Sequence, residues 1–183
     1  MTSLSRASKL LGGIVLALSL CMLSLQAQAV EPGKTYYTMY NVKTEKNKVM
    51  TTNYWRGELI PINTKVTLES INDKKMVLLI DERKITFKNV QKYTLRSMQE
   101  IADMYLGHGV DLTGYSSERR NEIKNGVLRL GMTKDEVLMT RGYPPRHETP
   151  STNANTWKYW SSRYVTRTLV FRDGKLVEGR GIN

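Results

Sequence analysis

Hydrophobic residues along this chain fall into one long run near the start and many short clusters after it. Arg6 and Lys9 precede the run, which extends from residue 10 to residue 25, and the sequence Gln26-Ala27-Gln28-Ala29 follows it. Basic residues, a short apolar stretch and an Ala-x-Ala end are the three parts of a cleavable secretion signal. Glycines and serines interrupt the run, and it is shorter than the roughly 20 apolar residues that span a bilayer, which disfavours a membrane anchor. We predict a signal peptide at residues 1–29.

The only cysteine of the chain, Cys21, lies within this apolar run. A bacterial lipoprotein signal places its acylated cysteine in such a position, but usually after Gly, Ala or Ser, whereas Leu20 precedes Cys21. Lipid anchoring at Cys21 is therefore the minor alternative to cleavage after Ala29. After that cleavage the chain holds no cysteine, which excludes disulfides, thiolate metal sites and a cysteine nucleophile.

Residues 30–94 show the pattern of short β-strands. Val66 and Leu68 alternate with polar neighbours, which is the period of a half-buried strand, and residues 76–80 form an apolar run typical of a buried strand. Pro61 suits a bend or an edge position. Further strand-like runs lie at residues 36–42, 49–55, 59–64 and 85–87. Five or so short strands over about 60 residues predict a small barrel, since an open sheet of that size leaves long edges unpaired.

Helices are predicted downstream of these strands. The first has one apolar face at i, i+3, i+4 and i+7 spacing, formed by Met98, Ile101, Ala102 and Tyr105. Together with the glycine-containing stretch at residues 108–115, it makes residues 95–115 a helix and linker. Ser116 and Ser117 can cap a second short helix that ends at Gly126.

A third helix is predicted from residues 132–137. Thr133 and Glu136 have the spacing of a capping box, in which the Thr133 hydroxyl accepts from the Glu136 backbone N–H and the Glu136 carboxylate reaches back to Thr133. The residues at the two ends of this segment are apolar and can pack as a hydrophobic staple. Gly142 ends the helix about two turns later, and Pro144-Pro145 prevents its continuation.

An antiparallel sheet is predicted after these helices. Trp157 and Tyr159 alternate along a strand and so share one face, where the helices would cover them as core. The pair Asp173-Gly174 between apolar runs is a strong hairpin signal, because both turn positions need positive φ. Residues 116–183 are therefore expected to form two short helices followed by an antiparallel meander, with the helices on one face of the sheet.

Two parts of the chain resemble known families. The C-terminal part resembles the SmpA/OmlA (BamE-like) domain family of outer membrane protein assembly factors, through Ile123-x-x-Gly126, Gly131-Met132-Thr133, Glu136-Val137, Gly142-Tyr143-Pro144, Trp157-x-Tyr159 and Val170-Phe171-x-Asp173-Gly174-x-Leu176. The element Ile60-Pro61-x-x-Thr64-x-Val66 resembles bacterial SH3-like barrels. These resemblances imply an α+β chain: a small SH3-like β-barrel at residues 30–94, then a BamE-like domain at residues 116–183, with two helices on a three- or four-stranded antiparallel sheet. They imply no catalytic residues.

The charge balance bears on partners. The chain carries 28 Lys and Arg against 17 Asp and Glu, a formal net charge of +11. Such a balance suggests nucleic acid in a cytosolic protein, but export excludes that partner. The remaining anionic partners are phospholipid headgroups, lipopolysaccharide, peptidoglycan and acidic proteins. The basic residues are spread in short clusters, which fits a dispersed, solubilising surface equally well.

Candidate catalytic and metal-binding residues are few. His108 and His147 are the only histidines, and each lies in a loop-like stretch. His108 with Asp111 falls short of the three or four ligands of a zinc site. Ser116 and Ser117 lack a Gly-x-Ser-x-Gly elbow and suit helix caps better. We expect no catalytic residue, no metal site and no cofactor.

The function expected from the sequence is noncatalytic binding or scaffolding in the periplasm, in association with the outer membrane. Partners would be envelope proteins, outer membrane assembly components among them, or anionic lipid and peptidoglycan. The predicted binding surface joins the turn at Tyr143, Pro144, Pro145 and Arg146 to Trp160, because aromatic and Arg side chains beside a rigid turn are good contact anchors. The alternative is an envelope hydrolase, or a β-lactamase-inhibitor-like inhibitor of a secreted enzyme, acting near the cell wall.

Overall fold

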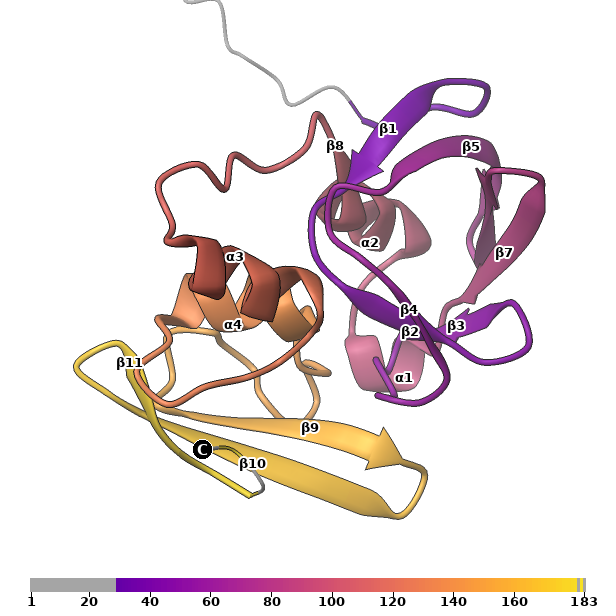
Figure 1. The fold of residues 1–183 in the computed structure, drawn as a ribbon. Helices are drawn as coiled ribbons and strands as arrows, with labels where there is room; N and C mark the ends of the chain where they lie inside the picture. The colour runs from indigo at the N-terminus through magenta and orange to yellow at the C-terminus, as the bar shows by residue number, and fades with distance from the viewer. Residues whose placement is uncertain (1–28, 181, 183) are drawn as a thin grey trace, which may run out of the picture.

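The chain has a mixed α+β fold, mostly sheet, in which two modules lie side by side (Figure 1). The computed structural model describes residues 29–180 and 182, so the predicted signal segment through residue 28, with Cys21, lies outside the described residues. Each module has its own hydrophobic core. Residues between 30 and 106 form the first core, and residues from 112 to 176 form most of the second. In the described part of the chain, no helix is long and apolar enough to cross a membrane.

The N-terminal module is built on a curled, six-stranded sheet (Figure 1). Its strands lie in the order β3-β7-β6-β5-β1-β8, and a separate pair is formed by β2 and β4. The bounds are β1 Thr35–Thr38, β2 Val42–Thr44, β3 Lys48–Met50, β4 Glu58–Ile60, β5 Lys65–Asn72, β6 Lys75–Ile80, β7 Arg83–Lys88 and β8 Leu106–Gly107. The strand β3 runs parallel to β7, and the other neighbours are antiparallel.

Two helices complete this module, α1 (Gln91–Thr94) and α2 (Met98–Tyr105). Ser97 and Glu100 form a capping box at the start of α2. The four apolar residues that predicted this helix are the ones that it buries, against the sheet core around Leu68 and Leu78. The chain then pairs with β1 as the short strand β8, so the helix at residues 98–105 packs as part of the N-terminal module.

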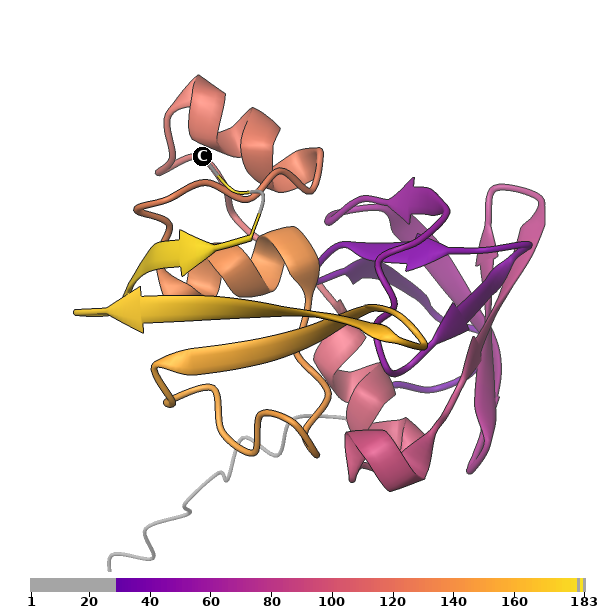
Figure 2. The ribbon, with the colours of Figure 1, turned by 90° about the horizontal axis from the view of Figure 1, so that it is seen from below.

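The C-terminal module places two helices on one face of a three-stranded sheet (Figure 2). The bounds are α3 Ser117–Lys124, α4 Lys134–Arg141, β9 Thr156–Ser162, β10 Val165–Arg172 and β11 Lys175–Gly179, with the strand order β11-β10-β9. Trp157 and Tyr159 are fully buried beneath the helices, which confirms that this face of β9 is core. Asp173 and Gly174 both have positive φ in the β10–β11 turn, as predicted.

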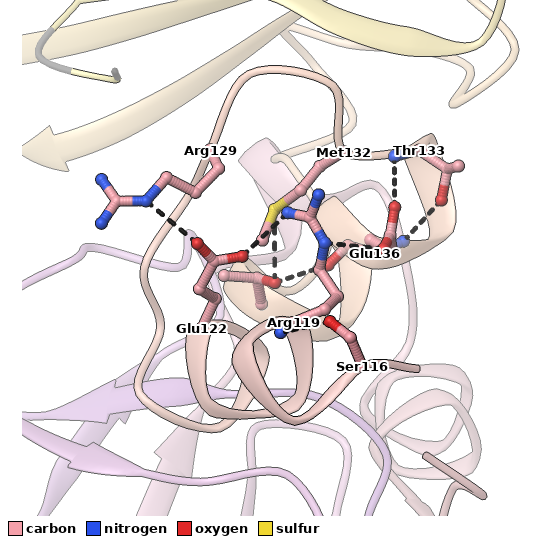
Figure 3. A network of polar contacts seen from close by, with 8 residues as sticks. Ser116, Arg119, Glu122, Arg129, Met132, Thr133 and Glu136 are labelled. Atoms are coloured by element: carbon pink, nitrogen blue, oxygen red, sulfur yellow. Dashed lines mark hydrogen bonds and ion pairs between the residues drawn. The ribbon is translucent and has the colours of Figure 1, made fainter. Parts of the chain in front are cut away.

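A network of charged side chains fixes α3 against α4 (Figure 3). Arg119 of α3 contacts Glu122 at 2.9 Å and reaches across to Glu136 of α4 at 3.2 Å. Glu122 also contacts Arg129, at 3.0 Å. The second carboxylate oxygen of Glu136 accepts from the Thr133 N–H at 2.6 Å, which completes the predicted capping box. The buried Glu136 carboxylate therefore both caps α4 and joins α4 to α3.

The expectation of a small barrel is met only in part. The sheet curls but its ends, β3 and β8, do not pair, and it holds six strands with β2 and β4 apart. The predicted strand at residues 36–42 breaks at a bend at Met39 and Tyr40, after which the Asn41 backbone N–H bonds to Met139 of the C-terminal module. The predicted strand at residues 49–55 pairs only to Met50, because Asn53 takes a left-handed conformation with φ 55° that ends the extended run.

Candidate functional site

Asn41 is fully buried where the two modules meet. Its Nδ2 donates to the carbonyl oxygens of Ile123 at 2.6 Å and Thr140 at 2.9 Å. Its Oδ1 accepts from the Ile62 N–H at 2.6 Å, and its own backbone N–H donates to the Met139 carbonyl at 3.0 Å. The last carbonyls of a helix have no partner within the helix. An N-terminal-module side chain therefore caps the carboxyl ends of both α3 and α4.

Two further asparagines repeat this kind of contact. Asn53 donates from Nδ2 to the carbonyl oxygens of Arg141 at 2.7 Å and Tyr143 at 3.1 Å. Asn63 exchanges two hydrogen bonds with the backbone of Val110, at 2.8 and 2.7 Å. Side-chain amides bonded to the backbone of a distant segment favour one arrangement of the two segments, although Asn53 Oδ1 is buried without a partner among the described residues. The modules therefore meet in a defined orientation.

Glycines allow the helix ends to approach the N-terminal module closely. Gly142, which ends α4 as predicted, has φ 75°, and a Cβ at this position would lie 2.7 Å from the ring of Tyr40. Gly126, which follows α3, has φ 69°, and a Cβ there would lie 2.8 Å from the ring of Trp55. Each helix end thus packs its backbone directly on an aromatic ring.

The predicted binding turn lies largely inside this junction. Pro144 and Pro145 are buried, Tyr143 is half-buried and Arg146 is exposed. The Tyr143 ring packs edge-on against Tyr40, with ring centroids 5.5 Å apart. The four residues of the turn line a small cavity of about 50 Å³ between the modules. Of these four residues, only Arg146 is exposed.

Trp160, the fifth predicted residue, lies in a larger groove of about 370 Å³ at the edge of the junction. We call this the junction groove, and it is lined by Met50, Thr52, Tyr54, Val90, Lys92, Tyr93, His147, Trp160, Arg163 and Tyr164. Residues 50–93 come from the N-terminal module, and the others come from the loop after α4 and from the β9–β10 hairpin. Neither module alone forms the groove.

A row of aromatic rings forms one wall of the junction groove. His147 lies between Tyr93, with ring centroids 4.8 Å apart, and Trp160, on which it stacks at 6.2 Å and 18°. The His147 backbone N–H and its Nδ1 both lie 3.0 Å from the Tyr93 carbonyl oxygen. Because a carbonyl only accepts, Nδ1 carries the proton. The imidazole is thus held in place as part of the wall.

Two cations lie at the rim of the junction groove. Lys92 lies over the Tyr93 ring at 4.7 Å, and Arg163 lies over the Tyr164 ring at 5.5 Å. Tyr164 is 83% exposed at the tip of the β9–β10 hairpin. No carboxylate side chain lines the groove in the described part of the chain. An aromatic groove with positive charges only at its rim suits a ligand that combines apolar and acidic groups.

The wall of the groove also holds polar atoms without partners. Among the described residues, Thr52 Oγ1 and Trp160 Nε1 are buried and form no hydrogen bond within the chain. Unpaired buried polar groups are costly, and few persist in a protein without a reason. Because both atoms are buried, a ligand in the groove reaches them only if the wall rearranges.

The groove has a histidine in its wall, and local contacts hold it. Its histidine has Nδ1 bound to a backbone carbonyl, and its Nε2 faces Glu148 at 3.5 Å. Elsewhere, a hydrogen bond from the Thr113 N–H lowers the pKa of Asp111, so this carboxylate closes a local turn near His108. Within residues 29–180 and 182, no three metal-ligating side chains gather. The arrangement can bind a ligand through ring faces, two cations and hydrogen bonds.

The sequence singled out Trp160 as a candidate but not its neighbours in the groove. Tyr54, Tyr93 and Tyr164 are far apart along the chain, and no spacing rule links them. The one available signal was the short polar turn after β9, which exposes Tyr164 at a hairpin tip. The chain matches no protein-family model, no curated protein and no solved structure.

Proposed function

We propose that this protein is a noncatalytic binding or scaffolding protein of the cell envelope, in which an SH3-like module and a BamE-like module act as one body. The observation that carries the proposal is the junction groove, which exists only because the two modules are held together. Its partner is an envelope protein that inserts an extended segment of apolar and acidic residues. The aromatic wall supplies the contact area, and Lys92 and Arg163 supply charge complementarity.

The export part of the proposal is supported by the surroundings of Val30, the first residue after the predicted cleavage site. Val30 is buried, and its backbone nitrogen lies 2.9 Å from the Asp103 carboxylate. The Gln99 side chain donates to the Val30 carbonyl at 3.2 Å. Cleavage after Ala29 would turn this nitrogen into an ammonium group. The Asp103 carboxylate lies close enough to form an ion pair with that group. The fold thus accommodates a chain that begins at Val30.

Site-specific crosslinking tests the binding surface. A photoreactive residue at position 164 should capture a defined envelope protein in intact cells, because Tyr164 is exposed at the groove. The matched control is position 37, since Tyr37 is also an exposed tyrosine, but on β1 and away from the groove. Tyr164→Ala should then weaken binding of the captured protein about tenfold, the scale of an aromatic interface anchor. Equal capture at both positions, or equal loss in Tyr37→Ala, would refute the assignment.

A further inference from the structure

A second hollow, separate from the junction groove, is lined by several positive charges. It has a volume of about 330 Å³ and shares no lining residue with the junction groove. Arg141, Arg167 and Arg180 line it together with Ser161, and Trp55 and Tyr159 form part of its apolar wall. We call it the arginine pocket. Within the described residues, no Asp or Glu lines it.

Arg141 is the unusual member of this set. It is 5% exposed, and its guanidinium carbon lies 4.7 Å from the Trp55 ring and 5.0 Å from the Tyr159 ring. In the described part of the chain its Nη2 is buried without a hydrogen-bond partner, and it forms no ion pair with a carboxylate. Ring faces and the carboxyl end of α4 favour a cation, but they leave the guanidinium donors unused. A buried guanidinium without an acidic partner is costly, and a bound anion would stabilise it.

Arg167 brings a second positive charge to the same place. Its Nε donates to Ser161 Oγ at 3.1 Å and its Nη1 donates to the Arg180 carbonyl at 2.7 Å, so the guanidinium is held by two neutral partners. Burial is the main cause that lowers the pKa of Arg141, to about 10, and the nearby charge of Arg167 acts in the same direction. Two like charges have thus been placed together, one of them buried. A fold tolerates this where an anion is bound between them.

Arg129 lies at the same pocket but is already neutralised. Its Nε contacts the Glu122 carboxylate at 3.0 Å, within the network that joins α3 to α4. The charges without an acidic partner are therefore those of Arg141, Arg167 and Arg180, in the part of the chain that the structure describes. Guanidinium groups present planar pairs of donors that match the oxygens of phosphate and carboxylate. Three cations match a phosphate group better than the single charge of a carboxylate.

We infer that the arginine pocket binds a phosphate group. Arg141 contacts the phosphate from the buried side, Arg167 and Arg180 close over it from the open side, and the Ser161 hydroxyl orients Arg167. The apolar wall with Trp55 excludes water and strengthens these charged hydrogen bonds. The phosphate is either a free, small phosphate compound or the headgroup of a lipid, and the two sources share this chemistry.

Calorimetric titration of the full-length mature chain with inorganic phosphate, at low ionic strength, tests the inference. Because Arg141 is buried and its replacement can unfold the chain, the decisive variant is Arg167→Gln. It should weaken phosphate binding about tenfold, the scale of one lost charge-assisted hydrogen bond. The matched control is Arg172→Gln, which removes an exposed arginine of the same strand outside the pocket and should leave binding unchanged. Two results overturn the inference: the wild-type chain binds no phosphate, or the two variants lose binding equally. The exception is a chain that binds lipid vesicles through Arg167, which the next experiment measures.

Cosedimentation with phosphatidylcholine vesicles, alone or mixed with phosphatidic acid, distinguishes the two sources. Binding to the mixed vesicles that Arg167→Gln abolishes and inorganic phosphate competes for supports a lipid headgroup. Phosphate binding in solution without sedimentation supports a small phosphate compound. Vesicle binding that Arg167→Gln and Arg172→Gln reduce equally, together with no binding of inorganic phosphate, reflects the general positive charge and overturns the inference.

Discussion

Replacing Asn41 with alanine removes the side chain that holds the carboxyl ends of α3 and α4 against the N-terminal module. Two backbone groups lose the partner they have among the described residues, the Thr140 carbonyl oxygen and the Ile62 N–H, whereas the Ile123 carbonyl oxygen keeps its bond from the Gly126 N–H. Asn41 is fully buried, so water cannot replace these bonds without opening the junction. A buried polar group without a partner costs about 1–3 kcal/mol. Taking about 1–2 kcal/mol for each of these two groups, because the junction can relax, the loss is about 2–4 kcal/mol.

Such a loss is a large part of the stability of an ordinary domain, about 5–15 kcal/mol. Urea denaturation measures it, with tryptophan fluorescence and far-ultraviolet circular dichroism as independent probes. Trp55 packs on Gly126 and Arg141 and so reports on the junction, and Trp157 reports on the core of the C-terminal module. The native chain should unfold in one transition if the junction couples the two modules. Asn41→Ala should lower the transition midpoint strongly.

The matched control is Asn155→Ala. Asn155 is exposed, and its one side-chain contact is a 3.5 Å approach by the Lys134 ammonium, so its replacement should change the stability by less than about 0.5 kcal/mol. A loss under about 1 kcal/mol in Asn41→Ala, or one no larger than that of the control, would show that the asparagine does not couple the modules.

Two further predictions follow from single contacts. Gly142→Ala should cost about 3 kcal/mol in thermal or chemical unfolding, because φ 75° with ψ −174° is a glycine conformation and the new methyl group would lie 2.7 Å from the Tyr40 ring. Gly114→Ala, with open space around it, should be nearly neutral, and a similar loss in both variants would contradict the reasoning. Amino-terminal sequencing of the exported protein should begin at Val30, and Asp103→Asn should destabilise that mature form by about 0.5–1 kcal/mol. A start at any other residue would remove the basis for that effect.

The local elements were predictable because their signals act over a few residues. The capping box at Thr133 and Glu136, the end of α4 at Gly142 and the turn at Asp173-Gly174 each depend on neighbours within about one helical turn or one hairpin. The apolar face of α2 was predictable for the same reason, since its spacing matches the helical period. Where a prediction failed, as in the strand at residues 49–55, a distant contact competed: Asn53 turns to bind the end of α4.

The candidate sites depended on contacts that no local pattern records. Asn41 binds carbonyls 82 and 99 residues away, and nothing in its neighbourhood distinguishes it from an asparagine in a turn. Arg141 looks like an ordinary basic residue at the end of a helix until Trp55 and Tyr159 enclose it. Capping, turn and amphipathic signals alone thus determined most of the helices and hairpins, and the order of two modules. Only the tertiary structure decided how the modules meet, because long-range packing selects which side chains become buried and which charges lose their solvent.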